Sequence, residues 1–237
     1  MRAEVEFEKD GSFLTVRVLG TPLKLCVGRV YVVHVEAPDG TWVGVFPEDV
    51  PRLLRLSRKR PDAAEEMISL VRELDPGVRA EVMRHYLGLA EERGVDFALQ
   101  KLRRRAGKRA EGRRIWNEVR KRGVVCVRER GVVLVYHAGY VFAFREKDGV
   151  PQVVRLGQRP ADIDKLPAIV SGSSRSWRTL VEFLDEEDPL VRRWKARNLM
   201  DILSNGEVLE RAGEDGRRIL EAVRTELEAY LALKGGE

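Results

Sequence analysis

The first 46 residues alternate between apolar and polar side chains, and this alternation restricts the fold more than any other feature of the chain. A period of two places every second side chain on one face, which is typical of a strand with one buried face. Asp10-Gly11 and Asp39-Gly40 are hairpin turn signals between such strands. We therefore predict an antiparallel β-meander with strands at residues 5–7, 13–18, 23–27, 30–35 and 42–46.

Helical periodicity replaces the alternation after residue 46. Proline or aspartate stands at the start of most of these segments, and both residue types favour the first turn of a helix. Gly107 and Gly112 predict a hinge or a helix break. We predict helices that begin at Pro47, Pro61 and Pro76, followed by helices at residues 95–105 and 113–122.

Strand-like runs return in the second half of the chain and give way to a helical end. The last forty residues carry an apolar stripe at helical spacing, which is more often a docking face within a fold than a coiled coil. We predict strands at 124–127, 132–136, 140–145, 153–156, 176–184 and 190–194, with a short helix from Asp162 that is kinked at Pro167.

These patterns together predict a mixed α+β protein of the broad α/β class. The chain has 237 residues, of which 43% are hydrophobic, enough for one large core or two small ones. We predict an N-terminal β-meander with helices at residues 1–107, a compact α/β domain at 108–198 and a helical C-terminal extension at 199–237.

Charged residues make up 34% of the chain, a proportion common in hyperthermophile proteins, where ion-pair networks gain value with temperature. The N-terminus has no apolar signal-peptide region and no apolar run is long enough to span a bilayer, so we expect a cytoplasmic protein without membrane contact. Cys26 and Cys126 lie in valine-rich runs, which favours buried free thiols, with a disulfide as the alternative.

The basic character of the chain is concentrated in residues 101–122. This stretch holds eleven Lys or Arg and two Glu, a local net charge of +9, whereas the whole chain carries +5. Such a concentration is the expected footprint of a phosphate-contacting surface, although a solvated helix face is the alternative. The candidate RNA-binding residues are Lys101, Arg103, Arg104, Arg105, Lys108, Arg109, Arg113 and Arg114.

The sequence lacks the glycine-rich phosphate loops and the nucleophile elbow of common enzymes, and it has no cluster at metal-ligand spacing. We therefore expect no metal and no cofactor. His34 and His85 are interpreted as structural. Tyr136 and His137, at a strand end, could act as base and acid in metal-free RNA cleavage, but a packing role is the alternative that spacing favours.

Residues 115–195 resemble the C-terminal domain of the archaeal tRNA-splicing endonucleases. The resemblance rests on the order and length of successive elements over about eighty residues rather than on one motif. The segments that carry it are IWNEVRKRGVVCV (115–127), GVVLVY (131–136), HAGYVFAF (137–144), DIDKLPAIV (162–170), RTLVEFLDEEDP (178–189) and LVRRWK (190–195).

The resemblance implies a degenerate active site. Active members of the family use a Tyr, a His and a Lys, whereas here Tyr136 and His137 are adjacent and the Lys position falls on Arg178. Neighbours in a strand point to opposite faces, so Tyr136 and His137 are not expected to flank one phosphate. The chain would then be a non-catalytic, structural subunit of a heterotetramer, two catalytic chains plus two structural ones.

In such a complex the catalytic subunit would cut precursor tRNA at bulged intron–exon junctions without metal, leaving a 2′,3′-cyclic phosphate and a 5′-hydroxyl. The family resemblance also implies an interface made by an acidic loop and a closing strand. The residues at those positions are Asp185, Glu186, Glu187, Asp188, Leu190, Val191 and Trp194.

Two other functions remain open. The chain can instead be a single-stranded nucleic-acid-binding protein unrelated to splicing, which predicts steep salt dependence and aromatic side chains along the basic surface. It can also be an assembly protein whose basic stretch binds an acidic protein.

Overall fold

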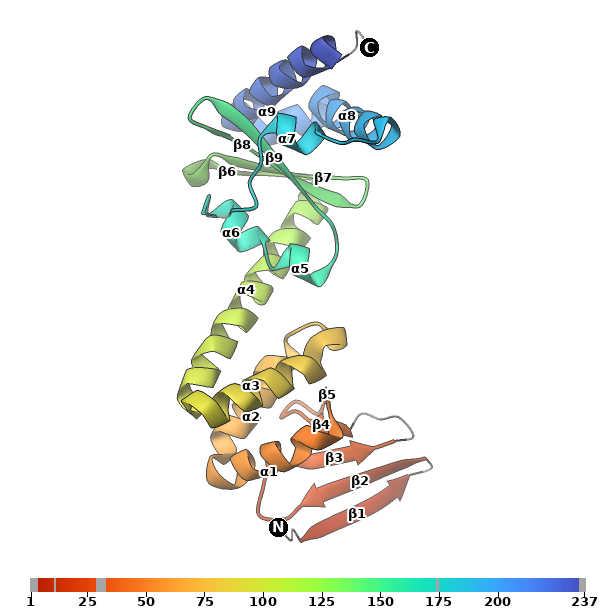
Figure 1. Cartoon of the computed structure of the whole chain (residues 1–237), viewed down its shortest axis with the longest axis vertical. Coiled ribbons are helices and arrows are strands. Elements are labelled where there is room, and N and C mark those ends of the chain that lie inside the picture. The colour runs from red at the N-terminus through yellow and green to blue at the C-terminus, as the bar shows by residue number, and fades with distance from the viewer. Residues whose placement is uncertain (1–3, 11, 29–32, 174, 235–237) are drawn as a thin grey trace. The chain divides into compact units, whose positions relative to one another are not determined.

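The computed structural model describes residues 4–10, 12–28, 33–173 and 175–234. Two antiparallel sheets, one of five strands and one of four, are combined with helices along the chain, which confirms the mixed α+β fold class (Figure 1). The chain divides into two compact units, residues 1–110 and 111–237, and each unit has its own sheet and its own buried core.

The sheet of the first unit is the meander that the alternation predicts, with strands hydrogen-bonded in chain order. The register pairs Leu25 with Val35, so that apolar side chains lie side by side on one face. Gly11 of the first predicted turn and residues 30–32 of the fourth predicted strand lie outside the described residues. The strands are β1 (Val5–Asp10), β2 (Phe13–Val18), β3 (Lys24–Val27), β4 (Val33–Glu36) and β5 (Trp42–Val45).

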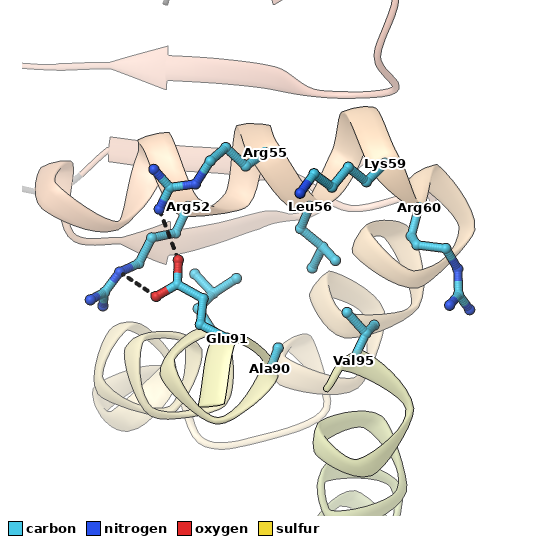
Figure 2. A pocket seen from close by; sticks show the side chains of 9 residues that line it. Arg52, Arg55, Leu56, Lys59, Arg60, Ala90, Glu91 and Val95 are labelled. Atoms are coloured by element: carbon cyan, nitrogen blue, oxygen red, sulfur yellow. Dashed lines mark hydrogen bonds and ion pairs between the residues drawn. The ribbon is translucent and has the colours of Figure 1, made fainter. Parts of the chain in front are cut away.

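Helices cover one face of this first sheet (Figure 1). Their apolar residues recur at helical spacing, so each helix buries one stripe. Leu56 of α1 and Ala90 of α3 lie close to Val95, where α4 begins (Figure 2). The elements are η1 (Pro47–Asp49), α1 (Val50–Lys59), α2 (Pro61–Arg72), η2 (Pro76–Val78), α3 (Arg79–Arg93) and the first part of α4 (Val95–Arg122).

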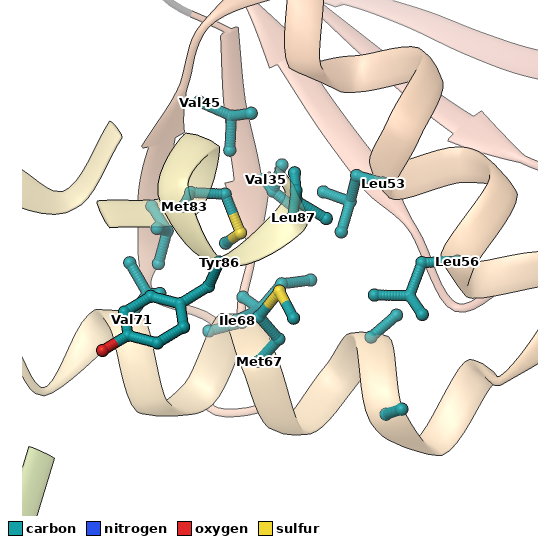
Figure 3. Close-up of a cluster of buried hydrophobic side chains, with 14 of the residues drawn as sticks. Val35, Val45, Leu53, Leu56, Met67, Ile68, Val71, Met83, Tyr86 and Leu87 are labelled. Atoms are coloured by element: carbon teal, nitrogen blue, oxygen red, sulfur yellow. The ribbon is translucent and has the colours of Figure 1, made fainter. Parts of the chain in front are cut away.

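The core of the first unit lies between the sheet and these helices (Figure 3). Val35 and Val45 enter it from the sheet, and Met67 and Met83 enter it from α2 and α3; all four side chains are fully buried. Burying a side chain of this size contributes roughly 1.5–3 kcal/mol to the free energy of folding. The first unit is therefore held together by sheet-to-helix packing.

The second unit is built on a four-stranded meander, and both faces of this sheet are covered. Alternation along β7 sends Val133 and Val135 to one face and Val132 and Leu134 to the other, and all four are buried. Helices α7, α8 and α9 pack on the first face, and the second part of α4 with α5 and α6 packs on the other. The strands are β6 (Val124–Val127), β7 (Val132–His137), β8 (Tyr140–Lys147) and β9 (Val150–Leu156).

The helices that follow β9 are short at first and then long. The short ones come from the segment around Pro160 and Pro167, where each proline occupies the first turn of a helix. The helices are α5 (Pro160–Ile163), α6 (Leu166–Val170), α7 (Leu180–Leu184), α8 (Pro189–Ser204) and α9 (Gly206–Lys234), and η3 (Arg128–Arg130) lies earlier, between β6 and β7.

The C-terminal helix α9 belongs to the core of the second unit. Leu220, Val223 and Leu227 are buried against the sheet and α8, which confirms the predicted docking face. Residues 199–237 therefore share their core with the preceding residues. Gly213, with φ of +70°, marks a kink inside the helix, and this backbone conformation favours glycine.

The predicted helix break between residues 107 and 112 is wrong, because α4 runs without interruption from Val95 to Arg122. Gly112 has a packing reason instead. A Cβ atom at this position would lie 2.3 Å from the carbonyl oxygen of Ile163, so only glycine allows α4 to approach α5 this closely. The glycine signal was therefore real, but it marked a close backbone contact rather than a hinge.

The two strands predicted at residues 176–184 and 190–194 are also wrong, because residues 180–184 form α7 and residues 190–194 lie in α8, while Thr179 makes only an isolated bridge to Gln152. Thr179 and Glu182 form a reciprocal capping box at the start of α7. Asp188 accepts hydrogen bonds from the first backbone amides of α8, and Pro189 occupies its first position. These local caps favour a helix over the strand that the apolar residues suggested.

The two cysteines are free and half-buried, so the described residues contain no disulfide. Burial raises the pKa of the Cys126 thiol. Within the described residues, no helix is both long and apolar enough to cross a membrane.

Candidate nucleic-acid interface

In the first unit, α4 presents a basic face. Lys101, Arg104, Arg105 and Lys108 are spaced three or four residues apart, so they share one side of the helix, and all four are exposed. The ammonium group of Lys101 lies 5.4 Å from the ring centre of Phe97. This face carries four of the predicted RNA-binding residues.

Two other predicted RNA-binding residues of the first unit have structural contacts. Arg103 forms a two-pronged ion pair with Glu66, with N–O distances of 2.5 and 2.7 Å, and this contact raises the pKa of Arg103. Arg109 is buried, and its guanidinium lies 3.8 Å from the carboxylate of Asp75. These contacts tie α4 to α2 and to the start of η2, so the two arginines are engaged within the unit.

Arg113 and Arg114 belong to the second unit and are exposed. Arg114 lies 3.5 Å from the carboxylate of Glu118, one turn further along α4, and Arg122 shares the same carboxylate at 3.6 Å. Exposed helix pairs of this kind contribute about 0.3–0.5 kcal/mol, so Glu118 lowers the local charge without holding these side chains firmly.

Tyr136 and His137 point to opposite faces of the second sheet. The ring of Tyr136 packs edge-on against Trp116, with 6.4 Å between the ring centres, on the face covered by α4. His137 is the register partner of Tyr140, which packs on the face covered by α8 and α9. The two side chains therefore cannot act on one phosphate from these positions, as the strand geometry predicts.

The acidic segment Asp185–Asp188 is the non-helical connection between α7 and α8, as predicted. Asp188 caps α8, and Glu186 accepts a hydrogen bond from the ammonium of Lys195 at 3.1 Å. Two of the four carboxylates therefore have contacts within the unit. Asp185 and Glu187 are exposed.

The outward side of α7 and α8 carries exposed apolar side chains. Leu190 is 72% exposed and Val181 of α7 is 51% exposed. Val191 and Trp194 are also exposed, and Leu190, Val191 and Trp194 lie on one side of α8 by helical spacing. The predicted interface residues are thus present on a helix face instead of a closing strand.

A basic groove that the sequence did not reveal lies along β9, the edge strand of the second sheet. It consists of two adjoining depressions of about 660 and 520 Å³ that share Arg155, Arg159 and Asp162. Val153 in this edge strand donates a backbone hydrogen bond to the carbonyl of Arg178, so the segment before α7 closes one side of the groove. The charged residues that line it are Arg155, Arg159, Lys165, Arg175, Arg178, Lys195 and Asp162.

Cations outnumber carboxylates in this basic groove. Its one carboxylate among the described residues, Asp162, is largely buried and pairs with Arg159 at 3.2 Å and with Lys165 at 3.5 Å. Arg175 and Arg178 are exposed, and the part of the chain that the structure describes offers them no ion-pair partner. The groove therefore keeps a surplus of positive charge that a bound anion would neutralise.

Aromatic rings border the same groove. The ring centres of Tyr140 and Trp194 are 6.4 Å apart, with an interplanar angle of 78°. The guanidinium carbon of Arg155 lies 4.8 Å from the centre of Tyr140 and 4.9 Å from that of Trp194. An arginine in contact with two partly exposed rings is an arrangement that suits both a phosphate and a flat aromatic ligand.

Sequence reasoning missed this groove because its residues are spread over β8, β9, the segment around α5, the segment before α7, and α8. No local run of charge marks them, unlike residues 101–122. The one groove residue that the sequence analysis singles out is Arg178, which the resemblance places at a degenerate catalytic position.

The first unit has a basic pocket of its own, about 380 Å³ in volume, between α1 and α3 (Figure 2). Arg52 and Arg55 both contact the carboxylate of Glu91, with N–O distances of 3.3 and 2.8 Å. Arg60 pairs with Asp96 at 3.3 Å. The arginines on this pocket's rim are therefore already matched by carboxylates of the same unit.

The described residues contain no group of three or more His, Cys, Asp or Glu side chains placed to hold a metal ion. Comparisons with protein-family models, with curated proteins and with solved structures find no match to this chain.

Proposed function

We propose that this protein binds nucleic acid without cutting it, and that the basic groove along β9 holds the phosphate backbone. The observation that carries the proposal is the surplus of positive charge in the groove, which six cations and one carboxylate line and where the described residues offer Arg155, Arg175 and Arg178 no carboxylate. Arginine is well suited to this role because its planar guanidinium can bind a phosphate through two parallel hydrogen bonds.

The chemistry of the groove supports binding more than proton transfer. Arginine stays protonated in proteins, so Arg155, Arg175 and Arg178 can bind an anion but cannot serve as general bases. Asp162, the carboxylate of the groove, is already held between Arg159 and Lys165.

The basic face of α4 supports the same proposal from the first unit. Lys101, Arg104, Arg105 and Lys108 provide a second row of exposed cations with the spacing of one helix face. Contacts from such a row would add affinity without sequence preference, because they reach phosphates and not base edges.

Charge reversal tests the proposal. In the full chain we expect Arg175→Glu combined with Arg178→Glu to weaken binding of a fluorescent oligonucleotide about 100-fold near 0.1 M salt, since two charge-assisted contacts are lost. The slope of log affinity against log salt should fall by about 1.4 for a single strand. Fluorescence anisotropy over a salt series measures both quantities.

Arg217→Glu combined with Arg218→Glu is the matched control, because both arginines are exposed on α9 and neither lines the groove. This variant changes net charge by the same amount and should weaken binding only slightly. Equal losses in the two double variants would mean that net charge alone attracts nucleic acid and that the groove is not the site.

A structural subunit of a tRNA-intron endonuclease is the second candidate. The observation in its favour is the exposed apolar face of Leu190, Val191 and Trp194 directly after the acidic segment, where the resemblance implies a subunit contact. The proposal predicts that the purified chain does not cleave a bulged precursor tRNA and that cleavage appears with a catalytic partner chain. Size-exclusion chromatography of Leu190→Glu with that partner would then show loss of the complex.

A further inference from the structure

We infer that Tyr140, Trp194 and Arg155 form a base-stacking site at the margin of the basic groove, so that the ligand of this groove is an unpaired, single-stranded segment. The inference rests on the proposed function and specifies which form of nucleic acid the groove binds, because phosphate contacts alone do not distinguish single strands from duplexes.

The exposure of Trp194 separates it from the other tryptophans of the second unit. Trp116 and Trp177 are 6% and 9% exposed and belong to the core, whereas Trp194 is 41% exposed. Trp194 therefore offers solvent-exposed apolar surface 4.9 Å from Arg155, an arginine that lines the groove. This is the surface that a nucleobase requires for stacking.

Regular secondary structure holds the backbone of both aromatic residues in place before any ligand arrives. Tyr140 follows a two-residue hairpin turn, in which Ala138 and Gly139 both have positive φ, and it is paired in register with His137. Trp194 lies in α8, where its carbonyl accepts a hydrogen bond from Asn198. A site on a tight hairpin and a capped helix loses little conformational entropy when it binds.

Arg155 connects the rings to the phosphate-binding part of the groove. Its guanidinium lies within 5 Å of both ring centres and it also lines both depressions of the groove. A base stacked on Trp194 would therefore place its own phosphate near Arg155 and the adjoining Arg159. In a duplex, neighbouring base pairs cover the base faces, so this contact requires an unstacked base.

The test uses three fluorescent probes of equal length: a single-stranded DNA oligonucleotide, the corresponding duplex and an abasic single strand that keeps only sugars and phosphates. We expect the native chain to prefer the single strand over both other probes. Trp194→Leu should weaken binding of the single strand about tenfold, because stacking on one aromatic side chain is lost. Binding of the abasic strand should not change.

Trp194→Phe is the second variant, because it keeps an aromatic face and should keep most of the affinity. Thermal unfolding followed by circular dichroism confirms that both variants are folded. Arg155→Lys should retain the salt dependence but lose part of the preference for the single strand, because an ammonium group does not stack as a guanidinium does.

Several outcomes would overturn the inference. Equal affinity of the native chain for the single strand and the duplex would do so. A Trp194→Leu variant whose affinity falls equally for the single strand and for the abasic strand would do so too. If Trp194→Leu changes no nucleic-acid affinity but disrupts a complex with a protein partner or with a second copy, the exposed ring belongs to a protein interface. Failure of the native chain to bind any of the three probes would instead contradict the proposed function itself.

Discussion

The basic pocket of the first unit and the basic groove of the second unit differ in how their charges are matched. The pocket of the first unit has Arg52, Arg55 and Arg60 on its rim, and each of them contacts a carboxylate. The groove of the second unit has arginines for which the described residues offer no carboxylate, among them Arg175 and Arg178. The number of cations around a pocket therefore does not identify an anion-binding site, whereas the balance between cations and carboxylates does.

The pocket and the groove also differ in the position of their carboxylates. In the first unit, Asp49 does not line the pocket but is buried at the start of α1, where it contacts the pocket residue Arg52 at 3.2 Å and also Arg84 at 2.8 Å. The arginines there hold helices together. In the second unit Asp162 restrains Arg159 and Lys165 at one end of the groove and Glu186 pairs with Lys195, whereas the described residues offer no carboxylate to Arg155, Arg175 and Arg178. Amide replacements of the individual acids therefore test the comparison directly.

The largest effect is expected for Asp49→Asn. Loss of the buried charge leaves Arg52 and Arg84 without their shared partner, so the free energy of unfolding should fall by about 2 kcal/mol. Nucleic-acid affinity should stay the same. Urea denaturation and fluorescence anisotropy measure the two quantities, and a variant that keeps full stability would show that this carboxylate is not what holds α1 and α3 in place.

A smaller effect in the opposite direction is expected for Asp162→Asn. Removing the groove's carboxylate frees Arg159 and Lys165, so affinity for a single-stranded oligonucleotide should rise about fivefold, by roughly 1 kcal/mol. The salt slope should become steeper. Unchanged or weaker binding would contradict the assignment of Arg159 and Lys165 to the phosphate site.

The smallest effect is expected for Glu91→Gln. The pairs of Glu91 with Arg52 and Arg55 are largely exposed, so stability should change by only about 0.5 kcal/mol. Oligonucleotide affinity should rise at most about twofold, because Arg52 and Arg60 keep their contacts with Asp49 and Asp96, and Arg55 alone loses the carboxylate that it contacts. A gain as large as that of Asp162→Asn would erase the difference between the pocket and the groove and make the first pocket a second anion site.

The local patterns of the sequence predicted most of the fold. The first meander, the strands β6 to β9 and the C-terminal docking helix all follow from periodicity and turn residues, because these signals act within a few positions of each other. The errors came from segments where two local signals compete. Strands were predicted at residues 176–184 and 190–194 from their apolar residues, but the caps at Thr179 and Asp188 favour the helices α7 and α8.

The candidate sites show the same limit more clearly. The basic stretch at residues 101–122 was visible, because its cations are consecutive in sequence. Which of them are available was not visible, since the partners of Arg103 and Arg109 lie in α2 and before η2. A sequence window cannot show an ion pair between residues more than thirty positions apart.

The sequence by itself determined the fold class, the order of most elements and the excess of positive charge, because each depends on residue type and short-range spacing. Only the tertiary structure decided where that charge is unmatched. Arg155, Arg178 and Trp194 meet because an edge strand, the segment before α7 and a turn of α8 converge on one groove. That convergence depends on packing in the core of the second unit, where contacts join residues far apart in the chain.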